Sequence, residues 1–314
     1  MRCVICTENK EKLTDEHVFP DAIGGTLVLT NVCKECNDRL GHSVDHHLVD
    51  NWLIQGERMS LKIRGKSGKL PNPLEKGVLA DNPNQQVRYY FDQEGNPQEV
   101  YLVPNIEKKK VDDNNEILNI SIDKKDKDKL PEMINKRLRR LGKPELTYEQ
   151  IEEEIVESVD PNPRVKMHIK MDMLQYKRAI LKIAYELAHY WLGQNYFDDS
   201  TGEIIRECIL DNNLSGDFSS QYPIKGSIDP IGEKARFNFW DDEPKNHIAF
   251  MIVDRNEIFC YLRIFSVFEG IIQVSVDANN YPDFKGKFIS INPISGVIRE
   301  STYLEEINRV TQGE

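Results

Sequence analysis

The chain has 314 residues and a formal net charge of −11, with 39% hydrophobic and 30% charged residues. This length predicts about two domains, and the composition is typical of a soluble globular protein. Proteins that coat nucleic acid through bulk attraction are normally basic, so the acidic balance excludes that class and leaves only local basic patches for such contacts. No stretch approaches the roughly 18 apolar residues of a membrane span. The motif that begins at Cys3 leaves no room for a secretory signal, so we expect a cytoplasmic protein that contacts no membrane.

Two Cys-x-x-Cys pairs lie near the N-terminus, Cys3 with Cys6 and Cys33 with Cys36. In a reducing compartment such pairs favour a metal over disulfides. The pairs are separated by 26 residues, so they can converge on one tetrahedral ion. Zinc suits four thiolates and would supply folding energy that so short a module cannot obtain from its own core. The alternative is a set of free core cysteines.

The residues between and after these pairs predict two strands and then a helix. Residues 16–20 and 26–32 have strand character and are joined by a double-glycine turn. Beyond the second pair, apolar residues recur every fourth position, as on one face of a helix: Leu40, Val44, Leu48 and Trp52.

The middle of the chain, residues 57–160, is rich in turn-forming and charged residues. It predicts short strands, within 87–91, 100–103 and 117–122, and a charged helix near 145–158. Two basic runs lie in this part of the sequence. Residues 58–69 hold five basic groups and no acid, and residues 124–143 hold nine against three acids. Either run could neutralise phosphates, or it could be a solvated surface.

Residues 171–192 predict the strongest helix of the chain. It is apolar over most of its circumference, Asp172 and Gln175 have capping-box spacing, and Gly193 closes it. Four later runs predict an antiparallel sheet packed on this helix: 247–253, 258–268, 271–276 and 287–292.

These elements give an α+β fold with three parts. Residues 1–56 form a zinc-stapled ββα module, residues 57–160 a basic, loop-rich middle region, and residues 161–314 a larger C-terminal domain of helix and antiparallel sheet.

The segment around the cysteine pairs carries one further motif. It consists of Asp15-Glu16-His17-Val18-Phe19-Pro20, then the double glycine, then Cys33-Lys34-Glu35-Cys36-Asn37. The first fifty or so residues therefore resemble the HNH endonucleases, the ββα-metal nucleases, in the version held by two zinc knuckles. Their pattern is an acid-His-hydrophobe-x-Pro strand, a Gly-rich turn, and a Cys-x-x-Cys followed at once by His or Asn.

This resemblance implies roles for three side chains. His17 is the general base, and Glu16 and Asn37 are ligands of one catalytic Mg²⁺ or Mn²⁺. Strict strand alternation would place Asp15, and not Glu16, on the face of His17. A bulge could re-aim either carboxylate, so both acids are candidates.

Two further histidines, His42 and His46, lie four residues apart after the second cysteine pair. Either could complete the metal shell or contact phosphate. The alternative is a solvated helix face, which needs no functional explanation.

The resemblance implies a divalent-metal-dependent endonuclease that hydrolyses DNA phosphodiester bonds, with a structural zinc, in restriction or phage defence. One ββα module cuts one DNA strand, so double-strand cleavage implies a homodimer or a larger defence assembly. Two alternatives stay open. One is a non-catalytic zinc-ribbon module that binds nucleic acid or protein, and the other is a ribonuclease with the same active site.

Overall fold

The structure is a computed structural model that describes residues 1–110, 116–156, 163–167, 169, 171–214, 221–230 and 245–312. By packing, the chain forms two units, Met1–Pro71 together with Lys170–Glu314, and Asn72–Ile169. The N-terminal module thus shares a unit with the C-terminal region, and the second unit is inserted between them in sequence. Whether residues 1–56, 57–160 and 161–314 act as separate functional domains stays a prediction. None of the helices in the described ranges is long and apolar enough to cross a membrane.

The N-terminal module has the predicted order of strand, strand and helix. Its elements are β1 (Thr14–His17), β2 (Val28–Val32), α1 (Lys34–Leu40), a π-helical segment (Gly41–Asp45), α2 (His46–Val49) and α3 (Trp52–Ser60). Leu40, Val44 and Leu48 are buried, as the four-residue spacing predicts. The helix is broken before Trp52, because the Asn51 side chain accepts a hydrogen bond from the Leu53 amide and begins α3 as a new helix.

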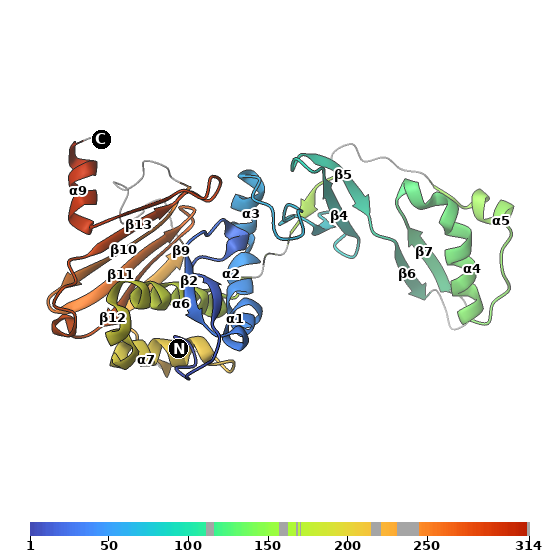
Figure 1. The fold of residues 1–314 in the computed structure, drawn as a ribbon. Coiled ribbons are helices and arrows are strands. Elements are labelled where there is room, and N and C mark those ends of the chain that lie inside the picture. The colour runs from blue at the N-terminus through green and yellow to red at the C-terminus, as the bar shows by residue number, and fades with distance from the viewer. Residues whose placement is uncertain are drawn as a thin grey trace. The chain divides into compact units, whose positions relative to one another are not determined.

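The C-terminal region is an antiparallel sheet with helices on it. The strand order is β14-β13-β10-β11-β12-β9. The bounds are β9 (Gly226–Pro230), β10 (His247–Asp254), β11 (Glu257–Ile264), β12 (Phe268–Ser275), β13 (Lys287–Ile291), β14 (Ile298–Ser301), α6 (Met173–Leu192), α7 (Ser200–Leu210) and α9 (Tyr303–Gln312). Figure 1 shows α6 and α7 on one side of this sheet and α9 on the other. The α+β class is confirmed, whereas β9, β14, α7 and α9 were not predicted.

The strand expected over 258–268 is too long. Phe265 and Ser266 have φ values of 53° and 63°, so the chain turns back after Ile264 and β12 begins at Phe268. Two consecutive residues with positive φ are typical of a tight hairpin turn. The sequence does not indicate this turn, because Phe265 and Ser266 stand where Gly, Asn or Asp would be expected. Phe265 is fully buried, so packing holds it in this uncommon conformation.

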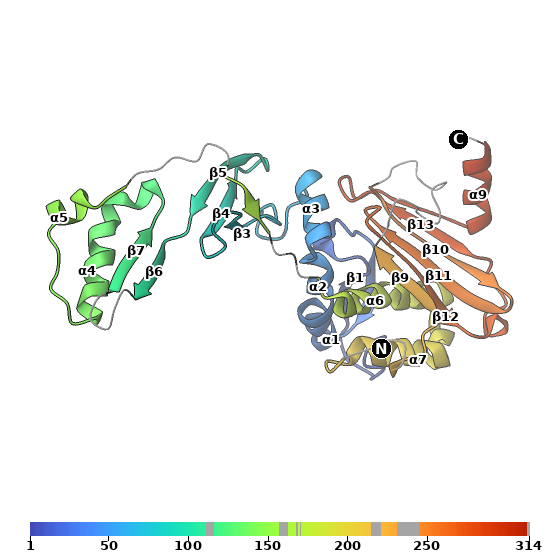
Figure 2. The same cartoon turned by 180° about the vertical axis from the view of Figure 1, so that it is seen from behind.

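Helix α6 lies between the N-terminal module and the sheet, as the two views agree (Figures 1 and 2). The Asp172 side chain accepts from the Gln175 amide at 3.1 Å, which confirms the predicted helix start. One continuous core joins Leu48 of α2, Ile183 of α6 and Leu262 of β11. The module therefore has no apolar core of its own.

The described residues of the inserted unit, Asn72–Ile169, form an antiparallel sheet of order β5-β4-β3-β8, a β6-β7 hairpin and two helices. The bounds are β3 (Lys76–Leu79), β4 (Gln86–Phe91), β5 (Pro97–Leu102), β6 (Asn105–Lys110), β7 (Glu116–Ser121), a 3-10 turn (Lys124–Lys129), α4 (Leu130–Arg140), α5 (Tyr148–Glu153) and β8 (Val165–Lys166). The three predicted short strands correspond to β4, β5 and β7. The basic run 124–143 contains helix α4, which was not predicted because charged residues dominate the run. Leu130 and Ile134 supply the apolar face of this helix.

Candidate active site and zinc centre

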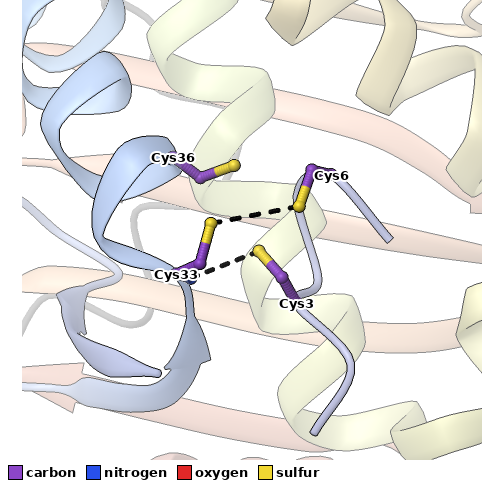
Figure 3. Close-up of side chains that lie close together, drawn as sticks. All are labelled: Cys3, Cys6, Cys33 and Cys36. Atoms are coloured by element: carbon purple, nitrogen blue, oxygen red, sulfur yellow. Dashed lines mark hydrogen bonds between the residues drawn. The ribbon is translucent and has the colours of Figure 1, made fainter. Parts of the chain in front are cut away.

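The four N-terminal cysteines come together at one point (Figure 3). Their Sγ atoms all lie within 4.8 Å of one another, and the Cys6 and Cys33 Sγ atoms are 3.9 Å apart. Zn–S bonds of about 2.3 Å place the sulfurs of a tetrahedral site about 3.8 Å apart. Within the described part of the chain, this is the only group of three or more His, Cys, Asp or Glu side chains placed to hold a metal. The arrangement fits a closed zinc site.

Hydrogen bonds favour the thiolate form at one of the four cysteines, Cys3. The Cys33 amide donates to Cys3 Sγ at 3.3 Å, across the gap between the knuckles. The hydrogen bond with the Cys36 thiol, followed by bonds from backbone amides, lowers the pKa of Cys3 to about 4 against the opposing effect of burial. The hydrogen bond with Cys3 raises the pKa of Cys36, and burial raises the pKa of Cys6, so these contacts favour the metal-binding thiolate at Cys3 and not across the whole site.

The pairing of the acid-histidine strand with β2 is irregular next to its two acids. β1 pairs with β2 through Thr14 opposite Val32 and Glu16 opposite Leu29, with a register shift between Thr14 and Glu16. The extra residue lies in β2, so side chains along β1 alternate normally: Asp15 is exposed and Glu16 is buried. The two candidate ligands therefore have opposite environments.

The His17 ring is held in one orientation. Its Nδ1 lies 3.0 Å from the carbonyl oxygen of Gly25, and the ring is half-buried. A carbonyl only accepts, so Nδ1 carries the proton and Nε2 keeps its lone pair. The turn needs glycine here, because a Cβ on Gly25 would lie 1.9 Å from the Phe19 carbonyl oxygen.

Glu16 is engaged by a residue from far along the chain. Its Oε1 lies 2.6 Å from Nζ of Lys182 on α6, and the Glu16 and Lys182 side chains are 5% and 0% exposed. The same ammonium lies 3.1 Å from Glu186 Oε2 and 3.5 Å from Asp45 Oδ2, and it donates to the His17 carbonyl oxygen at 2.6 Å.

This cluster shifts the ionisation of two of its acids. Burial raises the pKa of Glu186 well above its ordinary value, against the lowering effect of Lys182. Burial also raises the pKa of Asp45 to about 6, again opposed by Lys182. Sequence reasoning missed this cluster, although a lysine and a glutamate four residues apart in an otherwise apolar helix are a signal of buried charge.

Asn37 joins the start of α1 to β1. Its Nδ2 donates to the Asp15 carbonyl oxygen at 2.5 Å and to Thr14 Oγ1 at 3.3 Å. Both N–H groups therefore point at β1, which leaves Oδ1 as the atom that could bind a cation.

The residues around His17 offer suitable ligands for the expected catalytic cation, but the two acids lie on opposite faces of β1. Amide and carboxylate oxygens are the ligands that Mg²⁺ prefers, and Asn37 with Asp15 or Glu16 would supply them. Because Lys182 takes Oε1 of Glu16, that side chain would meet a cation only through Oε2. Asp15 is the acid on the exposed side.

The two helix histidines lie apart from the cysteine site. His42 is exposed on the π-helical segment, and His46 is half-buried with its ring centroid 3.7 Å from that of His47. Across the described ranges, neither belongs to a group of three or more His, Cys, Asp or Glu ligands. A catalytic cation could also use the amide of Asn37, which is not one of these four ligand types. A role for His42 or His46 beside Asn37 therefore stays a prediction.

The two basic runs differ in what they expose. Arg58, the first residue of the run 58–69, is only 5% exposed, so it is not available for phosphate contact. In the run 124–143, Lys125, Lys129 and Arg139 form ion pairs with nearby acids. Lys136, Arg140 and Lys143 are further exposed cations of the second run.

Comparison with known proteins supports the resemblance on the same residues. Residues 3–53 match the family described as HNH endonuclease. We call this segment the HNH domain, after the family that it resembles. The match spans both zinc knuckles, β1, β2 and the helix start, and it includes neither the inserted unit nor the C-terminal region. No curated protein and no solved structure matches the chain. The HNH domain supports nuclease activity on a nucleic acid.

Proposed function

We propose that the HNH domain hydrolyses phosphodiester bonds of DNA in a divalent-metal-dependent reaction, with His17 as general base. The observation that carries this proposal is the 3.0 Å contact from His17 Nδ1 to the Gly25 carbonyl oxygen. It leaves Nε2 as a proton acceptor on a ring that solvent reaches. A water molecule at Nε2 would give its proton to the ring while its oxygen forms a bond to phosphorus and the P–O3′ bond breaks.

A Mg²⁺ or Mn²⁺ ion would neutralise charge on the scissile phosphate and on the leaving 3′ oxygen. Asn37 Oδ1 would hold it together with Glu16 or Asp15, and His42 or His46 could complete the shell. The chain's own contribution is to fix these donors: Asn37 is bonded to β1 through Nδ2, and Glu16 is held by Lys182.

We further propose that exposed cations of the inserted unit, Lys136, Arg140 and Lys143, contact DNA phosphates. One HNH domain provides one site, so double-strand cleavage requires a second copy, as a homodimer or a larger assembly. Restriction or phage defence in the cytoplasm is the role that this layout suggests.

The test is cleavage of supercoiled plasmid with Mg²⁺, with Mn²⁺ and with chelator, by wild type and by His17→Ala. We expect nicking by the wild type with either ion, and a rate lower by about 10² to 10⁴-fold in the variant, the usual contribution of a general base. Equal zinc content and equal unfolding temperature would show that His17→Ala is folded.

Two other results would replace the proposal. If both proteins bind DNA equally and neither cuts, the domain is a zinc-ribbon binding module. If structured RNA is cut and plasmid is not, the substrate is RNA. Asp15→Asn and Glu16→Gln, compared for the Mg²⁺ concentration that gives half-maximal rate, identify the acid that holds the ion.

A further inference from the structure

Lys182 is an ammonium enclosed by oxygen atoms. Its side chain is 0% exposed, and its Nζ lies near three carboxylates and two carbonyl oxygens. These belong to Glu16 (2.6 Å), Glu186 (3.1 Å), Asp45 (3.5 Å), His17 (2.6 Å) and Val18 (3.4 Å). A buried charge is tolerated only where it is paired and hydrogen-bonded, so this site is built for a cation on the side chain.

Nearly all of these acceptors come from the HNH domain. Glu16, His17 and Val18 are consecutive residues at the end of β1, and Asp45 follows α1. Only Glu186, one turn further along α6, belongs to the C-terminal region. The ammonium nevertheless comes from a residue 165 positions after His17.

We propose that Lys182 is a positioning residue of the HNH active site. This inference rests on the proposed function of His17. By drawing the Glu16 carboxylate inward and bonding the His17 carbonyl oxygen, Lys182 fixes the backbone of β1, while Gly25 fixes the His17 ring. Lys182 thus restrains the backbone of His17 and Gly25 restrains its ring, so Nε2 of His17 points in one fixed direction. Lys182 itself is too buried to touch DNA.

Other α6 side chains also join the helix to the HNH domain, but at different places. The Tyr185 hydroxyl donates to the Val4 carbonyl oxygen at 2.6 Å, and Arg178 donates to the Ser43 carbonyl oxygen at 3.2 Å. Neither bond reaches β1. Tyr185→Phe therefore removes a bond of the same kind, from an α6 side chain to a domain carbonyl, without affecting the strand of His17.

The test compares Lys182→Met/Glu186→Gln with Glu186→Gln, Tyr185→Phe and wild type. Lys182→Met alone would leave three buried acids without their cation and could fail to fold, so the double variant also removes an acid. We measure kcat and KM for plasmid nicking, zinc content, and hydrogen exchange of the peptide that contains β1.

We expect the double variant to retain one zinc per chain and a KM within about two-fold of wild type, while kcat falls by about 100-fold, the typical cost of a misplaced reacting group. Exchange should rise at least ten-fold in the β1 peptide and stay unchanged at the knuckles. Glu186→Gln and Tyr185→Phe should keep the wild-type kcat and β1 exchange.

Wild-type kcat and β1 exchange in the double variant would overturn the inference, and cleavage by wild type would then leave the proposed function intact. Equal losses of kcat and thermal stability in the double variant and in Tyr185→Phe would also overturn it, because they indicate a general structural role. If the wild type itself cuts nothing, the proposed function fails. The exchange data then still decide whether Lys182 holds β1.

Discussion

The HNH domain is held at two ends by different means. At one end, four thiols from the first 36 residues meet at a site suited to zinc. At the other end, the strand that carries His17 is bound by an ammonium from α6, 165 residues away in sequence. The first anchor is local and the second depends on the C-terminal region. This difference implies that the domain's shape and its reactive strand can be disturbed separately.

The largest expected effect is loss of the zinc anchor. Structural zinc sites contribute on the order of 10 kcal/mol to folding, so Cys36→Ser should lose the ion and the folded HNH domain together. Cys260→Ala is the control, because Cys260 is equally a buried free cysteine but lies in β11. We expect it to keep one zinc per chain and to lose about 1 kcal/mol through a small cavity. Metal analysis with circular dichroism measures both. A wild-type protein that is fully folded without zinc would contradict this account.

A smaller effect is expected at the turn that orients His17. In Gly25→Ala the new Cβ would lie 1.9 Å from the Phe19 carbonyl oxygen, so the turn must move and take its own carbonyl away from His17. We expect about 3 kcal/mol less unfolding free energy, the upper end of the usual cost of overpacking, together with slower DNA nicking.

The matched control is Gly41→Ala. A Cβ there meets no atom within 4 Å, and Gly41 has a helical φ of −57°. This variant should be neutral or more stable by up to about 1 kcal/mol, since alanine favours helix. Denaturant unfolding of both proteins checks the pair. If Gly25→Ala is as stable as Gly41→Ala, the turn does not need glycine.

The local anchor could be predicted from sequence, and the distant one could not. The spacing of the cysteine pairs determines a four-sulfur site without knowledge of the fold, and the motif around His17 identifies its strand. Lys182 lies in a helix whose periodicity indicates burial, where a single lysine would be expected to face solvent. The glutamate four residues later signals a buried charge, but the partners of Lys182 on β1 follow only from contact between β1 and α6, which no local pattern encodes.

The same reason explains the ambiguity between the two acids. Alternation along β1 puts the two acids on opposite faces, but which face is buried depends on contact with α6, whose Lys182 binds Glu16. Likewise α4 was concealed because its basic face dominates the composition, whereas its apolar face packs only within the inserted unit. Contacts between distant segments decide these features.

Another contact between the C-terminal region and the HNH domain predicts the smallest effect, and it depends on pH. Nε2 of the buried His247 lies 2.9 Å from the carbonyl oxygen of Ile23, in the connection between β1 and β2. Burial lowers the pKa of His247 to about 4, against the opposing effect of this hydrogen bond. An unfolded histidine has a pKa of about 6.5, so between these values the unfolded state binds a proton that the folded state does not.

His247 thus contributes full stability above pH 6.5. Its contribution falls by about 1.4 kcal/mol per pH unit as pH decreases towards 4. His247→Phe should keep the ring contacts with Phe19 and Phe265 and show a shallower loss of unfolding free energy over this range. Urea unfolding from pH 7 to pH 4.5 measures the slope. An unchanged slope in the variant would show that His247 is not buried in its neutral form.

The most direct test of the central claim is the protonation pattern of the His17 ring, observed by ¹⁵N NMR at a pH where the ring carries one proton, with His17→Gln to assign its signals. The account predicts that the proton is on Nδ1, bonded to Gly25, and that Nε2 is bare. A ring with its proton on Nε2 could not accept a proton from water there, and it would contradict the assignment of His17 as the base.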